Sequence, residues 1–419
     1  MAIYKFRKKC RLCSSTKFNL VLDLGKQPPS NAFLTKNQLK KVEKKFPLRL
    51  YICKKCFHLQ LRDVVDKKYL FSHYLYLSGA NKPIIEHFEK YANSVYKKIL
   101  KQKINPYLIE IGSNDGTLLE KFLKFDVDVL GIEPAKNLAK ISSKKIKVEN
   151  KFFSKKLAKK IAEKRKADVI IANNVLGHID DLDDFINGIL KLLKNDGVFI
   201  FEVPHALDLL KKLEFDTIYH EHISYFTVFS LMKWFKNNNL EIFNIEKQKV
   251  HGGTLRIYVA KKNTHEIRKS VNNFKNQEIK FGINKLKTYE SFSNKINKLK
   301  ISLIKKIIKL KNEQNKIFGY GAPAKGNVLL NYCQINNKML DFITDTTSIK
   351  QGKYTPGTHI IVKSPKIISK FSKQYVGLIL AWNYKHDILQ KEKKFLDDGG
   401  KFLIPVPRPV LVSTNNKKY

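Results

Sequence analysis

Strand-like and helix-like segments alternate along the middle of the chain, from residue 107 to about residue 262. Short apolar runs of strand length are followed by segments in which apolar residues recur three and four positions apart, as on one face of a helix. The predicted strands are residues 107–111, 127–132, 169–172, 197–203, 241–245 and 254–259. The predicted helices are residues 118–123, 155–162, 182–193 and 231–237. This alternation is typical of an α/β domain built on a mostly parallel sheet.

The segments on either side of this domain have different patterns. Residues 1–70 contain short apolar runs separated by turn residues, which indicates a small β-rich unit with little core of its own. A helix is predicted for residues 82–103, and the central domain is placed at residues 71–262. The lysine- and asparagine-rich residues 263–315 have helical spacing and predict a linker of one or two long helices. A second strand–helix alternation predicts a C-terminal α/β domain over residues 316–419.

The size and composition of the chain are those of a soluble multidomain protein. Its 419 residues exceed the length of one ordinary domain, and its 43% apolar content allows a sizeable core. No apolar stretch is long enough to span a bilayer, and the basic N-terminus lacks the apolar segment of a signal peptide. We therefore expect a cytoplasmic protein with no membrane partner.

A formal net charge of +43 is large enough to suggest nucleic-acid binding. Only eight of the 80 basic residues are arginine, however, and the lysines are spread along the whole chain. Nucleic-acid binders usually gather basic residues on one face and use arginine to contact and stack on bases. We therefore expect solvated lysine faces and no nucleic-acid partner, although the charge would attract anionic substrates such as nucleotide diphosphates.

Two C-x-x-C pairs, Cys10 with Cys13 and Cys53 with Cys56, predict a metal site in the N-terminal unit. Two residues between cysteines let both thiolates of a pair reach one ion, and two pairs complete a tetrahedral zinc site. Because all four ligands come from the protein, the zinc is expected to be structural. The 39 residues between the pairs exceed the usual ribbon spacing, so four free structural cysteines are the alternative.

A glycine-containing turn at the end of the first central strand predicts a site for a nucleoside-containing cofactor. Its backbone and helix N-terminus can approach a ligand closely, and an acidic residue about twenty positions later can bind ribose hydroxyls. A nicotinamide site is the rival interpretation, but the turn lacks the G-x-G-x-x-G form, which favours a methyl donor. The predicted cofactor-binding residues are Glu110, Gly112, Asn114, Asp115, Gly116 and Glu133, with Asn173 and Asn174 at the end of a third strand.

The densest group of chemically active side chains is residues 219–226, Tyr-His-Glu-His-Ile-Ser-Tyr-Phe. Imidazole suits proton abstraction, a carboxylate can orient it, and a phenol can stabilise an oxyanion. The H-E-H spacing does not match H-E-x-x-H, which disfavours a protease-type metal site and leaves a second metal site as the alternative. His178, after the third strand, is expected near the same sheet edge, or else to be an ordinary loop residue.

Two later motifs suggest an anionic ligand. Residues 251–256, His-Gly-Gly-Thr-Leu-Arg, place backbone amides beside an arginine, and residues 319–327 form a glycine-rich turn between a strand and a helix. Tight turns with structural glycines are the alternative. The predicted substrate-binding residues are His251, Arg256, Gly321, Lys325 and Asn327.

Together these motifs resemble one family, the three-domain C-methyltransferases of deoxysugar biosynthesis, which act on nucleotide-linked 4-keto-hexoses. The resemblance covers nearly the whole chain. It also includes residues 22–25 with Gln27 and Pro28, residues 74–79, Asp345 with residues 350–357, and residues 405–407. It implies a zinc-binding N-terminal domain, a central class I (Rossmann-like) domain that binds S-adenosylmethionine, and a C-terminal Rossmann-like domain that helps bind the sugar nucleotide.

The resemblance also implies roles for individual residues. His222 would be the base that removes the proton at C-3, next to the C-4 ketone, and the resulting enolate would take the methyl group. Tyr76, Tyr219, Glu221 and His178 match positions that support the base and the enolate. A monomeric enzyme is expected. The alternatives are an O- or N-methyltransferase acting on a sugar and, less favoured, a zinc-knuckle methyltransferase that binds nucleic acid.

Overall fold

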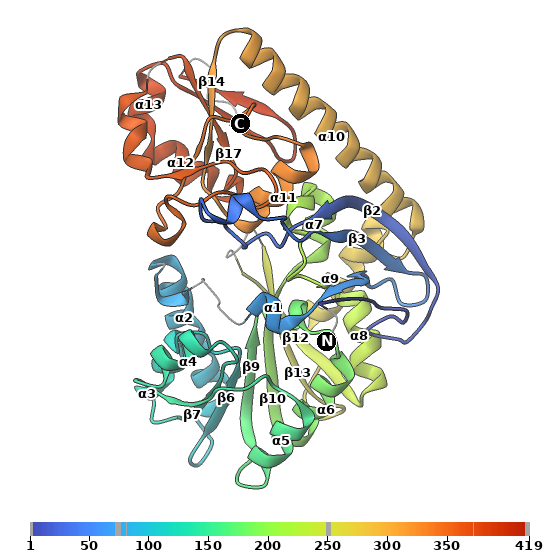
Figure 1. Cartoon of the computed structure of the whole chain (residues 1–419). Coiled ribbons are helices and arrows are strands. Elements are labelled where there is room, and N and C mark those ends of the chain that lie inside the picture. Colours follow the sequence, from blue (N-terminus) through green and yellow to red (C-terminus); the bar gives the residue numbers. More distant parts are fainter. Residues whose placement is uncertain (1–2, 72–76, 81, 249–252, 372, 415–419) are drawn as a thin grey trace.

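Two α/β units lie at opposite ends of the molecule, and strands of a third, N-terminal unit cross between them (Figure 1). The computed structural model of the chain describes residues 3–71, 77–80, 82–248, 253–371 and 373–414. Each α/β unit is built on its own mostly parallel sheet, and a four-cysteine cluster lies in the N-terminal unit. The fold class predicted from the sequence is therefore confirmed.

The central unit is a seven-stranded sheet in the order β12-β13-β10-β9-β6-β7-β8. Its strands are β6 (Tyr107–Ile111), β7 (Asp128–Ile132), β8 (Lys147–Glu149), β9 (Ala167–Asn173), β10 (Leu193–Pro204), β12 (Leu240–Gln248) and β13 (Thr254–Lys261). The strands from β10 to β8 run parallel, whereas β13 is antiparallel to both its neighbours. The apolar runs form inner strands because both faces of the sheet are covered by helices. Since the chain leaves β6 first to one side and then to the other, a crevice forms at the carboxyl ends of β6 and β9.

The helices of the central unit cover this sheet (Figure 1). They are α2 (Lys82–Val95), α3 (Thr117–Leu123), α4 (Lys136–Ser142), α5 (Lys155–Ala162), α6 (Leu182–Leu192), α7 (Ala206–Lys212) and α8 (Val228–Asn237). The predicted helix 82–103 ends earlier, because α2 closes in a single π turn at Tyr96–Leu100. Helix α7 was not predicted, since Ala206 to Leu210 are all buried and leave no polar face to reveal a helical period.

The C-terminal unit has a six-stranded sheet in the order β16-β15-β14-β17-β18-β19, whose five parallel strands repeat the arrangement of β8-β7-β6-β9-β10. Its strands are β14 (Lys316–Tyr320), β15 (Ile343–Thr344), β16 (Val362–Lys363), β17 (Tyr375–Ile379), β18 (Lys401–Ile404) and β19 (Val410–Val412). Its helices are α11 (Ala324–Cys333), α12 (Lys385–Lys391) and α13 (Lys393–Asp397). The turn between β14 and α11 lies at the point where the strand order reverses, which is the usual ligand-binding place in such sheets.

The N-terminal sheet includes a strand from the central unit. Its order is β11-β4-β3-β2, where β11 (Ser224–Tyr225) follows the catalytic candidates and β4 (Leu59–Leu61), β3 (Phe46–Cys53) and β2 (Phe18–Gln27) belong to the N-terminal unit. A separate two-stranded sheet pairs β1 (Tyr4–Phe6) with β5 (Asp63–Val65), and α1 (Lys67–Phe71) follows it. The segment 219–226 is therefore held from both the central and the N-terminal unit.

The two helices predicted as a linker pack into the molecule on different units. Helix α9 (Lys269–Phe281) packs against α8 and β12. Helix α10 (Leu286–Asn312) runs along one side of the molecule from the C-terminal unit towards β2 (Figure 1). It buries an apolar stripe, including Phe292, Leu299 and Leu303, in one continuous core with strands β2 and β3 and the C-terminal unit. The N-terminal unit thus shares its core with the C-terminal unit.

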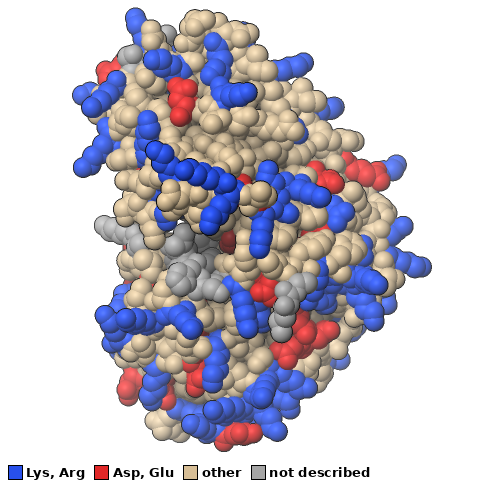
Figure 2. Space-filling model, viewed as in Figure 1, with Lys and Arg blue, Asp and Glu red and all other residues tan. Residues whose placement is uncertain are grey.

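Surface charge is dispersed on the face shown in Figure 2. Lysine and arginine side chains are scattered over the whole visible face, with acidic side chains among them. Every helix in the described part of the chain is too short or too polar to cross a bilayer.

Candidate active site

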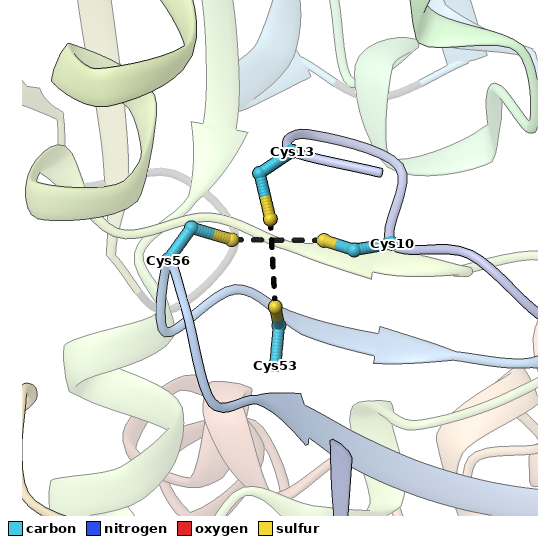
Figure 3. A group of neighbouring side chains, drawn as sticks. All are labelled: Cys10, Cys13, Cys53 and Cys56. Atoms are coloured by element: carbon cyan, nitrogen blue, oxygen red, sulfur yellow. Dashed lines mark hydrogen bonds between the residues drawn. The ribbon is translucent and has the colours of Figure 1, made fainter. Parts of the chain in front are cut away.

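The four cysteines of the N-terminal unit point towards one centre (Figure 3). Their sulfur atoms all lie within 4.8 Å of one another, with 3.6 Å between Cys10 and Cys56 and 3.6 Å between Cys13 and Cys53. A zinc–sulfur bond of about 2.3 Å places the sulfurs of a tetrahedral site about 3.8 Å apart. The side-chain amide of Gln60 donates to Cys10 Sγ at 3.1 Å, the kind of outer contact that holds metal thiolates. The arrangement fits a structural zinc ion.

The cysteine cluster is connected to the segment 219–226 through Arg11. This buried guanidinium donates to the carbonyl oxygens of Leu61 (2.5 Å) and Ile223 (3.3 Å). It also pairs with Asp180 at 3.0 Å. Arg11 lies between Cys10 and Cys13 in the sequence. Hydrogen bonds therefore connect the cysteine loop to strand β4 and to the residue before β11.

A cavity of about 820 Å³ lies where the three units meet. It opens over the carboxyl ends of β6, β9 and β10, at the crevice that the sheet topology predicts. The N-terminal unit contributes Tyr4, Val65 and Leu70, among others. The central unit contributes residues that include Glu110, Glu133, Asn173, His178 and His222. The C-terminal unit contributes Lys325, Asn383 and Tyr384, among others.

One end of the cavity is lined by polar groups at the carboxyl ends of β6 and β9. Glu110 Oε2, Ser113 Oγ and Asn173 Nδ2 are buried and have no hydrogen-bond partner among the described residues. Burial, followed by the carboxylates of Glu133 and Asp115, raises the pKa of Glu110 well above its usual range. Orphaned buried polar atoms are costly, so this end is suited to a polar ligand that supplies the missing partners.

Six of the eight residues predicted for the cofactor line this cavity: Glu110, Gly112, Asn114, Glu133, Asn173 and Asn174. Gly112 has a φ of +73°, and a Cβ there would meet the Val175 side chain at 2.5 Å, so the turn requires glycine. The Glu133 carboxylate accepts hydrogen bonds at 2.8 Å from the backbone amides of Asn114 and Ala135.

The structure places the other two, Asp115 and Gly116, outside the cavity lining. The Asp115 carboxylate accepts from the backbone amide of Gly79 (2.8 Å), and Asn114 Oδ1 accepts from that of Ser78 (3.0 Å). Asp115 and Asn114 therefore hold the backbone of residues 78 and 79 next to the predicted cofactor-binding turn.

His222 also lines the cavity, in contact with Tyr219. Its Nδ1 lies 3.1 Å from the carbonyl oxygen of Thr217, which can only accept, so Nδ1 carries the proton. Its Nε2 is then the basic nitrogen, and it lies 2.8 Å from the Tyr219 hydroxyl. The Tyr225 hydroxyl donates to the His222 carbonyl at 2.7 Å and fixes the backbone.

His178 lies edge-on to His222, with 5.0 Å between the ring centroids. Its Nδ1 donates to the carbonyl oxygen of Glu221 at 2.7 Å. Burial lowers the pKa of His178, so its imidazole is neutral near pH 7. A neutral neighbour adds no positive charge that would make His222 less basic.

The Glu221 carboxylate is buried and points to the N-terminal unit. It accepts two hydrogen bonds from Asn31 Nδ2, at 2.8 and 3.0 Å. Burial raises the pKa of Glu221 to about 7, and the Asn31 hydrogen bonds lower it in part. Sequence reasoning did not identify Asn31; the only local signal is its place in the turn that follows Gln27-Pro28-Pro29.

Of the predicted substrate-binding residues, Lys325 lines the cavity. Its ammonium lies over the Trp382 ring at 4.0 Å and donates to Asn383 Oδ1. Burial lowers the pKa of Lys325 to about 8, and the neighbouring Asp216 and Glu214 carboxylates partly offset this. Near pH 7 the side chain therefore remains mostly cationic.

The structure gives two other predicted substrate-binding residues, Gly321 and Asn327, internal positions. Gly321, with a φ of +82°, forms the turn after β14. Asn327 Nδ2 donates to the Ser30 carbonyl at 2.7 Å. Neither residue lines the cavity. Tyr76 and His251, also predicted as site residues, lie outside the described residues.

Arg256 is held in an internal network and does not line the cavity. Its guanidinium pairs with the buried carboxylate of Glu202 at 2.6 Å and stacks on the Tyr91 ring at 3.4 Å. His87 Nε2 donates to the same carboxylate at 3.0 Å. Because Glu202 and His87 do line the cavity, Arg256 supports its wall from behind.

Replacing Arg256 with methionine is expected to lower the free energy of unfolding by about 3–5 kcal/mol, because Glu202 is left as a buried, under-compensated charge. Chemical denaturation followed by circular dichroism measures this. The matched control is Arg268→Met at an exposed position, for which a change within about 0.5 kcal/mol is expected. Equal stability of the two variants would contradict the structural role of Arg256.

Three family models match successive parts of the chain. They are "Putative zinc binding domain" over residues 10–71, "Methyltransferase domain" over residues 84–245 and "C-methyltransferase C-terminal domain" over residues 249–407. C-methyltransferase NovU of Streptomyces niveus is 32% identical over 411 residues, which are 97% of this chain and 97% of that protein. A ubiquinone biosynthesis O-methyltransferase of Pelagibacter ubique (strain HTCC1062) is 29% identical over 34% of this chain and 64% of its own.

Solved methyltransferase structures are similar to part of the chain. Magnesium protoporphyrin IX methyltransferase (ChlM) from Synechocystis PCC 6803 with bound SAM has 12% identity and a TM-score of 0.32, covering 43% of this chain and 82% of that one. An S-adenosylmethionine-dependent methyltransferase from Clostridium acetobutylicum ATCC 824 has 14% identity and a TM-score of 0.34, covering 41% and 91%.

Proposed function

This chain belongs to the family of C-methyltransferases that join a zinc-binding, a methyltransferase and a C-terminal domain, and from that premise we propose that it methylates C-3 of a nucleotide-linked 4-keto-deoxyhexose. S-adenosylmethionine is the proposed methyl donor, and Zn²⁺ the proposed structural ion. The observation that carries the proposal is the contact between His222 Nε2 and the Tyr219 hydroxyl, which are 2.8 Å apart. Both residues line the same cavity as the predicted cofactor-binding residues Glu110 and Glu133.

The residues at the carboxyl ends of β6, β7 and β9 are suited to S-adenosylmethionine. When bound, it supplies an electrophilic methyl group on a sulfonium. Glu133 offers a carboxylate for ribose hydroxyls, and Gly112 lets the backbone come close. The unpartnered atoms of Glu110 and Asn173 are matched to polar groups of such a ligand.

Carbon methylation needs a base, because a C–H carbon has no lone pair to attack with. His222 Nε2 is the proposed base that accepts the proton from C-3. The hydroxyl hydrogen of Tyr219 can turn from His222 to the C-4 oxygen, which stabilises the enolate and leaves the imidazole lone pair to the C-3 proton. Glu221 and His178 support this pair. The backbone carbonyl of Glu221 accepts a hydrogen bond from His178 Nδ1, which holds the His178 ring beside that of His222.

The C-terminal unit closes the cavity over this site with Lys325, Asn383 and Tyr384. A cationic Lys325 is suited to the diphosphate of a sugar nucleotide, and burial strengthens that attraction. Enclosure by three units also keeps water from the enolate.

Calorimetric titration tests this assignment. The purified protein is titrated with S-adenosylhomocysteine and then, once saturated, with thymidine diphosphate. Two separate binding events are expected. Donor binding without nucleotide binding would contradict the sugar-nucleotide acceptor, and absence of donor binding would contradict the proposed cofactor.

Replacing Glu133 with glutamine is expected to weaken S-adenosylhomocysteine binding by about 10- to 100-fold, because charge-assisted hydrogen bonds to the ribose are lost. The same titration measures the effect. Glu149→Gln on the neighbouring strand β8 is the control, since its side chain is 38% exposed and lies outside the cavity lining. Unchanged affinity in Glu133→Gln would contradict the ribose assignment.

A further inference from the structure

The Glu221 side chain, in the catalytic segment (residues 219–226), is contacted from the N-terminal unit by Asn31. Its amide nitrogen lies 2.8 Å from Glu221 Oε1 and 3.0 Å from Oε2, so it donates to the carboxylate between its two oxygens. The two residues are 190 positions apart in the sequence. Asn31 does not line the cavity, whereas Glu221 does, so any effect of Asn31 on the reaction passes through Glu221.

The loop that carries Asn31 is held in place by the C-terminal unit. Asn327 on helix α11 is almost fully buried and donates to the Ser30 carbonyl at 2.7 Å. Asn331, one turn further along the helix, donates to the Asn327 carbonyl at 2.7 Å and to the Pro356 carbonyl at 2.9 Å. The backbone amide of Ala32 donates to the Pro29 carbonyl and closes the turn. The position of Asn31 is therefore set by the N-terminal and C-terminal units together.

We propose that Asn31 is a positioning residue of the methyl-transfer reaction: it fixes the orientation of the Glu221 carboxylate, so that the N-terminal unit and helix α11 jointly organise the catalytic segment. The part of this proposal that concerns catalysis rests on the proposed function. Within the described part of the chain, the Asn31 amide donates to both oxygens of the Glu221 carboxylate. A buried carboxylate with a fixed donor holds one orientation, and its backbone carbonyl then holds His178.

Burial has the largest effect on the pKa of Glu221, and the Asn31 hydrogen bonds are the side-chain contact that opposes it. His220 and His222 flank it on its own segment, and His178 faces it from the short helix Leu176–His178. Burial lowers the pKa of both His220, to about 4, and His178, so that neither is charged at neutral pH. Burial raises the pKa of Glu221 to about 7, and the Asn31 hydrogen bonds act in the opposite direction. Loss of the Asn31 amide therefore raises the pKa further and leaves Glu221 protonated near pH 7.

The test is a carbon NMR titration of the full-length protein labelled with ¹³C at the glutamate side-chain carboxyl. Glu221→Gln identifies the Glu221 signal by its disappearance. In Asn31→Ala the midpoint is expected about one pH unit higher than in the wild-type protein, because a hydrogen bond to a carboxylate is worth at least that much. Asn31→Gln, which keeps the amide, is expected to restore part of the shift.

Two further variants separate positioning from a general loss of structure. Asn37→Ala, at an exposed position in the same unit with no side-chain capping bond, is the matched control and is expected to titrate like the wild-type protein. Asn327→Ala, which frees the Ser30 carbonyl, is expected to move the midpoint in the same direction as Asn31→Ala but less. A Glu221 midpoint in Asn31→Ala equal to that of the wild-type protein would overturn the proposal.

The catalytic part is measured as the pH dependence of kcat with a keto-sugar nucleotide. The acid limb is expected to move upward in Asn31→Ala together with the NMR midpoint. An NMR shift with an unmoved kcat profile would overturn the catalytic role of Asn31. The NMR titration needs no turnover, so it tests the contact between Asn31 and Glu221 even if the protein methylates no keto-sugar. Absence of methylation would refute the proposed function and not this contact.

Discussion

Asparagine in place of His222 is expected to lower kcat for methyl transfer by about 100- to 10,000-fold, the usual contribution of a general base. Asparagine keeps a similar size but has no basic nitrogen at the position of Nε2, which lies 2.8 Å from the Tyr219 hydroxyl. Binding of S-adenosylhomocysteine should be unchanged, because the proposed donor site is formed by other residues, among them Glu110 and Glu133. Steady-state assays with a keto-sugar nucleotide measure kcat.

A control and an isotope experiment make this prediction specific. His265→Asn, whose ring stacks on Phe243 outside the cavity lining, should retain nearly full activity. With a substrate deuterated at C-3, the wild-type protein should exchange deuterium for solvent hydrogen, and His222→Asn should not. More than a tenth of wild-type kcat in His222→Asn would contradict its role as the base and would favour methylation of a hydroxyl or amine.

Loss of the structural metal is expected to abolish most activity, although the metal site is not part of the cavity. The cysteine cluster, Arg11 and strand β4 hold the backbone of Ile223 and strand β11, next to the proposed base. In zinc-finger peptides such a site contributes about 10–16 kcal/mol to folding. Cys53→Ser should therefore lose bound zinc, lower the melting temperature and lose at least about 90% of kcat.

Metal analysis of the purified proteins, with melting curves and assays, tests this prediction. Cys333→Ala is the control, because Cys333 lies buried in helix α11, away from the cluster, and this variant should keep one zinc per chain. A metal-free protein with full activity would contradict the support that the cluster gives to the catalytic segment.

The features that the sequence alone could predict are those with local signals. Strand β6 and helix α5 agree with the predicted residues 107–111 and 155–162. A buried inner strand gives a short continuous apolar run, and an amphipathic surface helix gives a helical period, and both are visible in neighbouring residues. The two C-x-x-C pairs predicted a cluster whose sulfurs do converge. The turn at Gly112 and the acid at Glu133 could be found because sheet topology brings consecutive strand ends together.

The remaining features depend on contacts between distant parts of the chain. Nothing near Asn31 in the sequence indicates Glu221, and nothing near β11 indicates that it completes the sheet of the N-terminal unit. Arg256 was predicted to bind an anionic ligand, but its partner is Glu202 on the adjacent strand. A buried arginine and a ligand-binding arginine have the same local sequence, and only strand register tells them apart.

The central claim is that the methyl group is transferred to carbon, and carbon NMR of the product tests it most directly. The enzyme is incubated with S-adenosylmethionine carrying a ¹³C-labelled methyl group and a nucleotide-linked 4-keto-deoxyhexose labelled with ¹³C at C-3. The account predicts a methyl signal split by one-bond coupling to C-3, which shows a new carbon–carbon bond. A labelled methyl signal without that coupling, at the position of an O- or N-methyl group, would contradict it.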